Sequence, residues 1–272
     1  MKIRTLASSI CLLCLLVSGC KGDGELKVIS FNIRYDNPAD SINAWPNRAD
    51  FVADWLREET PDLFGLQEVL WHQYEFLRER LQGYGSVAAG RSDGLREGET
   101  CPVFFNSSRF ELIDDGTFWL SETPDLPGSL GPGAALPRIT TWVQLKERES
   151  GRKLFFFNTH FSHVSDSARL MSAVILSGAV KNIAGDAFFV LTGDFNLKPD
   201  SKAYEALTGE GAQWHVLYDT YLMASEPPAG PPFTFNGFTD RPGDGRIDYI
   251  FVPAGTKVIT HETVEKRNDS IF

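Results

Sequence analysis

The chain has 272 residues, 42% of them hydrophobic and 12% aromatic, which is enough for one large domain with a substantial core. It carries 26 basic and 36 acidic residues, a formal net charge of −10. A surface this acidic lacks the basic footprint that phosphate backbones attract, which argues against tight, non-specific binding to long DNA or RNA. A bound metal can reverse the field locally, so a nuclease is not excluded.

The first twenty residues differ from the rest of the chain. Lys2 and Arg4 supply positive charge, and an apolar run follows over residues 10–17. This run is too short to cross a bilayer, and the whole pattern is typical of an export signal.

The signal ends in the tetrapeptide VSGC at 17–20, which resembles a bacterial lipobox, where the Cys carries the lipid. We therefore predict a signal peptide over 1–19, lipidation of Cys20 followed by a tether to residue 25, and one domain over 26–272. The predicted location is outside the cytoplasm, anchored to a membrane, with the membrane face left open. The alternative is an ordinary cleavable signal with a chance Cys.

Cysteine usage agrees with this prediction. Cys11 and Cys14 leave with the signal and Cys20 is lipidated, so Cys101 alone remains, and it cannot form an internal disulfide. Cys101 begins an apolar run without a nearby His, so we predict a buried packing residue rather than a nucleophile.

Short apolar runs predict the strands, and several are apolar at consecutive positions, as expected for strands covered on both faces. Residues 139–145 alternate instead, which predicts an antiparallel, half-exposed strand. A further alternating stretch covers 257–264. The predicted strands are 26–31, 63–66, 103–105, 139–145, 154–157, 187–191 and 247–252.

Three amphipathic segments predict helices at 47–59, at 72–81 and from Ser165 or Asp166 to about 183. No linker or repeat divides the chain, so we predict one α/β domain. Long loops in such a domain are usually functional. They are expected at 36–46, 90–100, 121–137 and 225–246.

Polar residues stand at the ends of five of these predicted strands. Each has an ordinary explanation as a turn residue or a hydrogen-bonded core group. Five convergent cases indicate a site, because buried carboxylates repel one another unless a cation lies among them. An oxygen-rich set without Cys favours Mg²⁺ or Mn²⁺ over Zn²⁺. The residues are Asn32, Glu68, His160, Asp194 with Asn196, and Asp248.

The segments that carry these residues resemble the ordered motifs of the endonuclease/exonuclease/phosphatase family. They are FNIR (31–34), LQE (66–68), NTH (158–160), GDFN (193–196) and RIDYIF (246–251). The family fold is a four-layer α/β sandwich, with two mixed sheets packed face to face and helices outside. Three further segments resemble a subgroup of exported bacterial hydrolases: WPNR (45–48), GTFWLSETP (116–124) and ALPRITTW (135–142).

The resemblance implies a metal-dependent hydrolase of phosphate mono- or diesters, with a role for each matching residue. Glu68 is the principal metal ligand, and Asn32 supports the metal or the scissile phosphate. Asp194 positions or deprotonates the attacking water, and Asn196 orients that water or donates to a phosphate oxygen. His160 donates to the phosphate in the transition state.

Three more residues follow from the resemblance. Asp248 in the family orients a second, C-terminal His. Arg138 is a candidate phosphate contact. His163, which follows Ser162 where many relatives carry Asp-His, is a candidate for the border of the pocket. We expect a monomer acting on a small, lipid-linked or nucleic-acid phosphate ester.

One departure from the family bears on activity. Family members end with a Ser-Asp-His segment on a last strand, and this sequence ends at 268–272 (NDSIF) without it. His261 follows Asp248 too soon to replace that His. We therefore expect an open edge where the strand is missing, and slower catalysis. The alternative function is a non-catalytic surface-binding lipoprotein derived from such a hydrolase.

Overall fold

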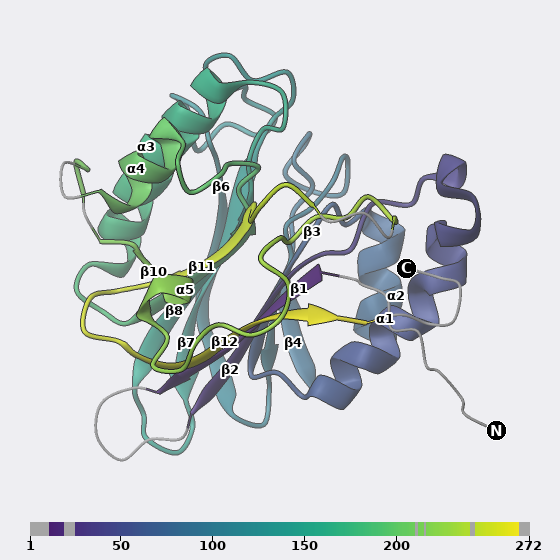
Figure 1. Cartoon of the computed structure of the whole chain (residues 1–272), viewed down its shortest axis with the longest axis horizontal. Helices are drawn as coiled ribbons and strands as arrows, with labels where there is room; N and C mark the ends of the chain where they lie inside the picture. Colours follow the sequence, from purple (N-terminus) through teal and green to yellow (C-terminus); the bar gives the residue numbers. More distant parts are fainter. Residues whose placement is uncertain (1–10, 19–24, 210–211, 215, 240–242, 267–272) are drawn as a thin grey trace.

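A computed structural model describes residues 11–18, 25–209, 212–214, 216–239 and 243–266. Two six-stranded mixed sheets pack face to face, with helices on both outer sides (Figure 1). The predicted four-layer α/β sandwich is therefore confirmed.

The first sheet contains one parallel pair, β2 with β3, and its other neighbours are antiparallel. Its strands, in spatial order, are β12 (Lys257–Glu265), β1 (Cys11–Ser18), β2 (Leu26–Asn32), β3 (Leu63–Gln67), β5 (Val103–Asn106) and β4 (Tyr84–Val87).

The second sheet also contains one parallel pair, β8 with β9. Its strands, in spatial order, are β10 (Tyr218–Asp219), β11 (Asp248–Val252), β9 (Phe189–Asp194), β8 (Lys153–His160), β7 (Ile139–Glu147) and β6 (Phe110–Trp119).

Helices cover the outer face of each sheet (Figure 1). On the first sheet lie α1 (Trp45–Glu59) and α2 (Trp71–Arg80), and on the second lie α3 (Asp166–Ala184) and α4 (Lys202–Thr208). The 3-10 helix η1 (Pro38–Asn43) precedes α1, and the single turn α5 (Thr220–Met223) precedes β11. The start of α3 agrees with the sequence, because the Ser165 side chain accepts from the backbone N–H of Ala168.

Consecutive apolar residues in the strands pack into two different cores, one on each face of the sheet. In β8, Phe156 faces the core between the sheets, whereas Phe155 and Phe157 pack toward α3. In β2, Val28 faces inward and Ile29 packs toward α1 and α2. The period of two along a strand places alternate residues on opposite faces, so continuous apolar runs are the expected pattern for these buried strands.

The prediction from the sequence did not include the strands whose residues are mostly polar or exposed. β6 has five consecutive exposed positions, including Asp114 and Asp115, and it lies at the edge of the second sheet. Its charges and its bulge near Asp114 are features that protect an edge from further pairing. The short β4, β10 and α4 were also missed. β7 is antiparallel to both neighbours and partly exposed at alternate positions in its second half, as predicted.

The apolar N-terminal run forms β1, antiparallel to both β2 and β12. The sequence predicted an open edge in this region, but β1 fills the place between β2 and β12 in the part of the chain described. Removal of residues 1–19 as a signal would take this strand out of the sheet. Residues 19–24, including Cys20, lie outside the described residues. Of the helices in the described ranges, none has both the length and the hydropathy required to cross a membrane.

Candidate active site

The two parallel strand pairs bring the predicted site residues together. Asn32 ends β2 opposite Gln67 of β3, and His160 ends β8 opposite Asp194 of β9. Asp248 begins the antiparallel β11 and also lies opposite Asp194. Each sheet therefore contributes polar residues at the same end of the sandwich.

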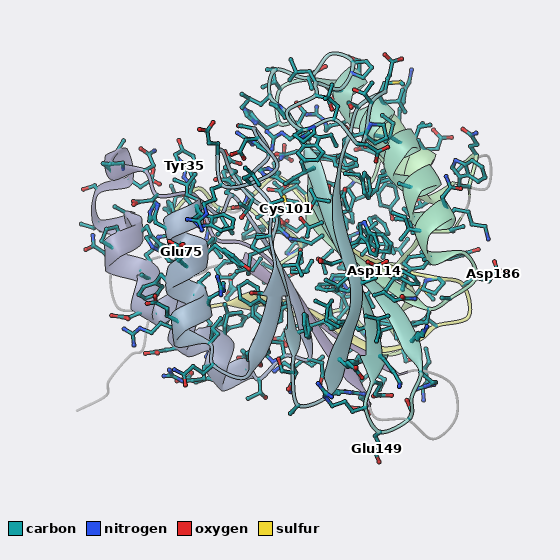
Figure 2. All side chains as sticks on the ribbon, turned by 180° about the vertical axis from the view of Figure 1, so that it is seen from behind. Tyr35, Glu75, Cys101, Asp114, Glu149 and Asp186 are labelled. Atoms are coloured by element: carbon teal, nitrogen blue, oxygen red, sulfur yellow. The ribbon has the colours of Figure 1, made fainter. Side chains whose placement is uncertain are left out.

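Labelled residues near the strand ends mark this end of the molecule. Figure 2 shows Tyr35, just after β2, and Cys101, just before β5, in the upper half of the molecule. Glu149, in the turn between β7 and β8, lies at the opposite end.

Three side chains from the two sheets form a compact cluster. Glu68, His160 and Asp194 each offer one ligand atom, and these atoms lie within 4.8 Å of one another. Nε2 of His160 is 3.8 Å from Oδ2 of Asp194. We call this group the Glu68–His160–Asp194 cluster.

Asn32 bridges the two carboxylates of this cluster. Its Nδ2 donates to Oε1 of Glu68 and to Oδ2 of Asp194, both at 2.9 Å. Its Oδ1 accepts from the backbone N–H of Arg34, which fixes the nitrogen toward the carboxylates. In this geometry Asn32 holds two acidic groups together, and its predicted support of a metal or of the scissile phosphate stays a prediction.

Neighbouring groups fix the orientation of His160. Nδ2 of Asn196 donates to the carbonyl of Phe161 and lies 3.0 Å from Nε2 of His160, so this ring nitrogen accepts. The Nδ1–H then faces Oε2 of Glu99, 3.7 Å away. Burial and the positive charges of Arg138 and Arg91 lower the pKa of His160 well below its usual value, which keeps the ring neutral.

The carboxyl groups at this site are buried close enough to repel one another when they are ionised. Burial raises the pKa of Asp194 to about 6, with a smaller contribution from the charge of Glu68. Burial, followed by the charge of Asp194, raises the pKa of Asp248 well above its usual range. Carboxyl groups buried this close together fit a divalent cation, and oxygen donors are the set that Mg²⁺ and Mn²⁺ prefer.

Two buried arginines lie next to the cluster on the side of the second sheet. Arg91 donates to Oε2 of Glu99 at 2.8 Å. Nη2 of Arg138 lies 3.2 Å from Nδ1 of His163, so the structure brings these two predicted substrate contacts together. Arg138 is only 5% exposed, and its Nε and Nη1 have no hydrogen-bond partner among the described residues. Two guanidinium nitrogens without a partner leave N–H donors for an acceptor such as an oxyanion.

The backbone is unusual at three positions around the cluster. Arg34, Glu68 and Asn196 have φ values of 61°, 58° and 50°, in the left-handed region that non-glycine residues rarely adopt. Each follows a strand end by one or two residues and turns a functional side chain into the site. Such conformations cost on the order of 1 kcal/mol or more each and collect at functional sites.

Asn158 connects the two sheets directly beneath the cluster. Its Oδ1 accepts from Nε2 of Gln67 at 2.7 Å and from Oγ1 of Thr192 at 3.0 Å. Its Nδ2 donates to the carbonyls of Leu66 and Pro102 at 2.7 and 2.9 Å. This fully buried amide therefore uses all of its hydrogen-bonding capacity to join β8 to β3.

Gly65 makes this contact between the sheets possible. A Cβ atom at Gly65 would lie 2.2 Å from Oγ1 of Thr192 and 2.5 Å from the Asn158 side chain. The small residue therefore allows β3 and β8 to approach closely next to Glu68.

Three other residues from the sequence analysis lie as follows. Asp248 is hydrogen-bonded to Thr234, whose hydroxyl accepts from the backbone N–H of Asp248 at 3.1 Å. His261 is on β12, where its Nδ1 is 3.1 Å from Oγ1 of Thr220 and its ring packs on Tyr221. His261 is therefore not in the site, as predicted. Cys101 is buried, and burial raises the pKa of its thiol to about 12, as expected for a packing residue.

Sequence reasoning missed Glu99, Arg91 and the central role of Asn158. Glu99 and Arg91 come from the long loop at 90–100, where length indicated function but no spacing marked individual residues. Asn158 did carry a signal, because it follows three Phe residues in a fully buried strand.

A cavity of about 260 Å³ opens beside the cluster, on the side of the first sheet and the loop at 225–246. We call it the side cavity. It is lined by Phe31, Asn32, Ile33, Arg34, Asp40, Arg48, Glu68, Asp194, Thr234, Phe235, Asn236, Gly237, Phe238, Ile247 and Asp248.

Solved structures share the fold of this chain. An endonuclease/exonuclease/phosphatase from Bacteroides vulgatus is 37% identical with a TM-score of 0.86, covering 92% of this chain and 95% of that one. A mannosyl-6-phosphatase from Bacteroides thetaiotaomicron is 33% identical with a TM-score of 0.79, covering 86% and 88%.

Curated relatives are more distant. An uncharacterized protein of Acanthamoeba polyphaga mimivirus is 27% identical over 180 residues, covering 63% of this chain and 67% of that protein. The other curated relatives are matched over 33% to 56% of their own length.

The sequence pattern described as "Endonuclease/Exonuclease/phosphatase family" matches residues 29–270, beginning within β2 and therefore after β1. This match covers nearly the whole domain and includes every strand that contributes to the cluster. With the shared fold and an identity of 37% over almost the full length of a solved relative, it establishes that the chain belongs to the endonuclease/exonuclease/phosphatase family.

Proposed function

We propose that this protein is a metal-dependent hydrolase of phosphate mono- or diesters that acts outside the cytoplasm. The observation that carries the proposal is the Glu68–His160–Asp194 cluster, in which residues from two sheets meet within 4.8 Å. The family and the mannosyl-6-phosphatase among its relatives support a phosphate ester as the substrate.

Glu68 and Asp194 are the residues that would hold a divalent ion, Mg²⁺ or Mn²⁺, with His160 beside them. When bound, the ion supplies charge neutralisation at the phosphate and favours deprotonation of a water molecule. Asn32 keeps the two carboxylates at a fixed separation through its paired donation at 2.9 Å.

The chain's own groups supply the remaining requirements of displacement at phosphorus. Asp194 lies where a carboxylate oxygen can position the attacking water beside the ion. Arg138 has two nitrogens, Nε and Nη1, whose N–H groups are unpaired among the described residues and are donors for phosphate oxygens. Asn196 at Nε2 and Glu99 near Nδ1 fix the orientation of the His160 ring, which burial and the charges of Arg138 and Arg91 keep neutral.

The test is hydrolysis of two chromogenic substrates, p-nitrophenyl phosphate and bis(p-nitrophenyl) phosphate, by the purified protein with Mg²⁺ or Mn²⁺. We expect turnover of at least one, abolished by a chelator and by Glu68→Ala. Activity that survives both treatments would refute the metal assignment.

A catalytically impaired, surface-binding protein is the second candidate. The observation that favours it is Asp248, whose described side-chain partner is Thr234 rather than a second histidine. Metal and phosphate binding without turnover, measured by isothermal titration calorimetry, would support this candidate against the hydrolase.

We also propose export and lipid anchoring through Cys20. The support comes from the N-terminal sequence and from the start of the family match at residue 29, after the apolar run. The anchor would hold the active site close to a membrane, where small or lipid-linked phosphate esters are the accessible substrates.

A further inference from the structure

The side cavity carries a second inference, which rests on the proposed function. The cavity shares Glu68 and Asp194 with the cluster and is also lined by Asp248, so a phosphate held at the cluster would direct its alcohol group into this space. The residues that form the rest of the cavity lining then indicate the chemistry of that alcohol group.

One wall of the cavity is an exposed aromatic ring. Phe235 lies on the loop at 225–246, lines the cavity and is 62% exposed. Leaving an aromatic ring in water at the mouth of a polar site has no benefit to folding, because burial is what makes such a ring stabilising. The ring offers a flat apolar surface to the C–H face of a bound group.

The cavity lining also contains an arginine with unused hydrogen-bonding capacity, whose Cζ lies 5.1 Å from the centroid of the Phe238 ring. Arg48 is 2% exposed, and it donates to the carbonyls of Asn43 and Ile33. Its Nη2 has no partner among the described residues, although the side chain lines the cavity. A buried, unpaired N–H is costly unless a ligand supplies an acceptor.

A rigid ion pair completes the polar wall. Nε and Nη2 of Arg34 donate to the two carboxylate oxygens of Asp40 at 2.9 and 3.2 Å. The pair presents both donors and acceptors side by side, which is the arrangement that neighbouring hydroxyl groups require.

The balance of charge excludes a second anionic group in the cavity. Two arginines, Arg34 and Arg48, line the cavity together with four carboxyl groups, those of Asp40, Glu68, Asp194 and Asp248. We propose that the side cavity binds a neutral, polyhydroxylated ring, so that the preferred substrate is a sugar phosphate whose sugar stacks on Phe235 and bonds to Arg48 and the Arg34–Asp40 pair.

The test compares a hexose 6-phosphate with ethyl phosphate, which has neither ring nor hydroxyl groups. We expect Phe235→Ala to lower kcat/KM for the hexose phosphate about tenfold more than for ethyl phosphate, the size of one lost aromatic contact. Phe235→Trp should restore most of the loss. Leu222→Ala, which removes a side chain that is 72% exposed on α5, is the matched control and should change neither substrate.

Equal effects of Phe235→Ala on the two substrates would overturn the proposal. A selective effect on a nucleoside 5′-monophosphate instead of the hexose phosphate would also overturn it. Saturation-transfer NMR with the free hexose separates this inference from the proposed function. Binding that is lost in Phe235→Ala, in a protein that hydrolyses no ester, would keep the cavity assignment and reject the hydrolase.

Discussion

The side-chain amide of Gln67 donates to the side-chain oxygen of Asn158 across the interface between the two sheets, at a distance of 2.7 Å. Gln67 immediately precedes Glu68, so this bond fixes the position of one carboxylate relative to the strand that carries His160.

We expect Asn158→Ala to destabilise the fold by about 3 kcal/mol, because it leaves several buried polar groups without partners. The free energy of unfolding, measured in urea, tests this. Activity at a temperature where the variant is folded should still fall, since Glu68 loses its indirect support. Asn106→Ala, on the less buried end of β5, is the control, and an equal loss there would contradict the special role of Asn158.

Glu68→Gln keeps the shape of the side chain but removes its charge. We expect metal affinity and metal-stimulated hydrolysis to fall by more than about 100-fold. Titration calorimetry with Mn²⁺ and initial rates measure the two effects. Glu75→Gln, on an exposed carboxylate of α2, should change neither; retained Mn²⁺ binding in Glu68→Gln would show that the ion is held elsewhere.

Asp194 predicts a pH dependence in the metal-free protein. Its pKa is raised from 3.8 to about 6, so the folded state favours the protonated form. The stability associated with this group is present at low pH and is lost as the pH rises from about 4 to 6. Metal binding requires the ionised form, so metal affinity should fall about tenfold per pH unit below 6.

Calorimetric titration with Mn²⁺ between pH 5 and pH 7.5 tests this dependence. Asp194→Asn should bind weakly with a flatter profile. An unchanged slope in that variant would assign the proton to another group.

Arg138→Lys separates charge from hydrogen-bond geometry. Lysine keeps the positive charge but cannot place N–H donors at the positions of Nε and Nη1 of a planar guanidinium. We expect kcat/KM to fall by about 100-fold, in the range of a lost transition-state donor. The control is Arg96→Lys, on an exposed arginine of the neighbouring loop. Wild-type rates in Arg138→Lys would place the phosphate elsewhere.

Cys20→Ser tests the lipid anchor. In a bacterial host that processes lipoproteins, we expect the wild-type protein in the membrane fraction and the variant in the soluble fraction. Mass spectrometry of the N-terminal peptide identifies the modification. Membrane association that persists in Cys20→Ser would contradict lipidation at this residue.

The sequence was sufficient for the layers of the fold and for most of the cluster. Strands such as β8 and β9 are apolar until their last residues, so the polar residues at their ends stood out. Asn32 shows the limit of this reasoning, because its residue type did not reveal that the amide nitrogen faces two carboxylates. The roles of Arg91 and Glu99 depend on how a long loop folds back over the second sheet, and no periodicity encodes that path.

The left-handed backbone at Glu68 has a consequence for how this protein would respond to selection. Glycine adopts that conformation without steric cost, so Glu68→Gly should relieve strain while it removes a carboxylate from a crowded acidic group. A screen for heat resistance alone would therefore favour glycine at this position and enrich robust, inactive proteins. Thermal tolerance and turnover are opposed at a single residue here, and any engineering of this enzyme needs an activity screen applied in parallel.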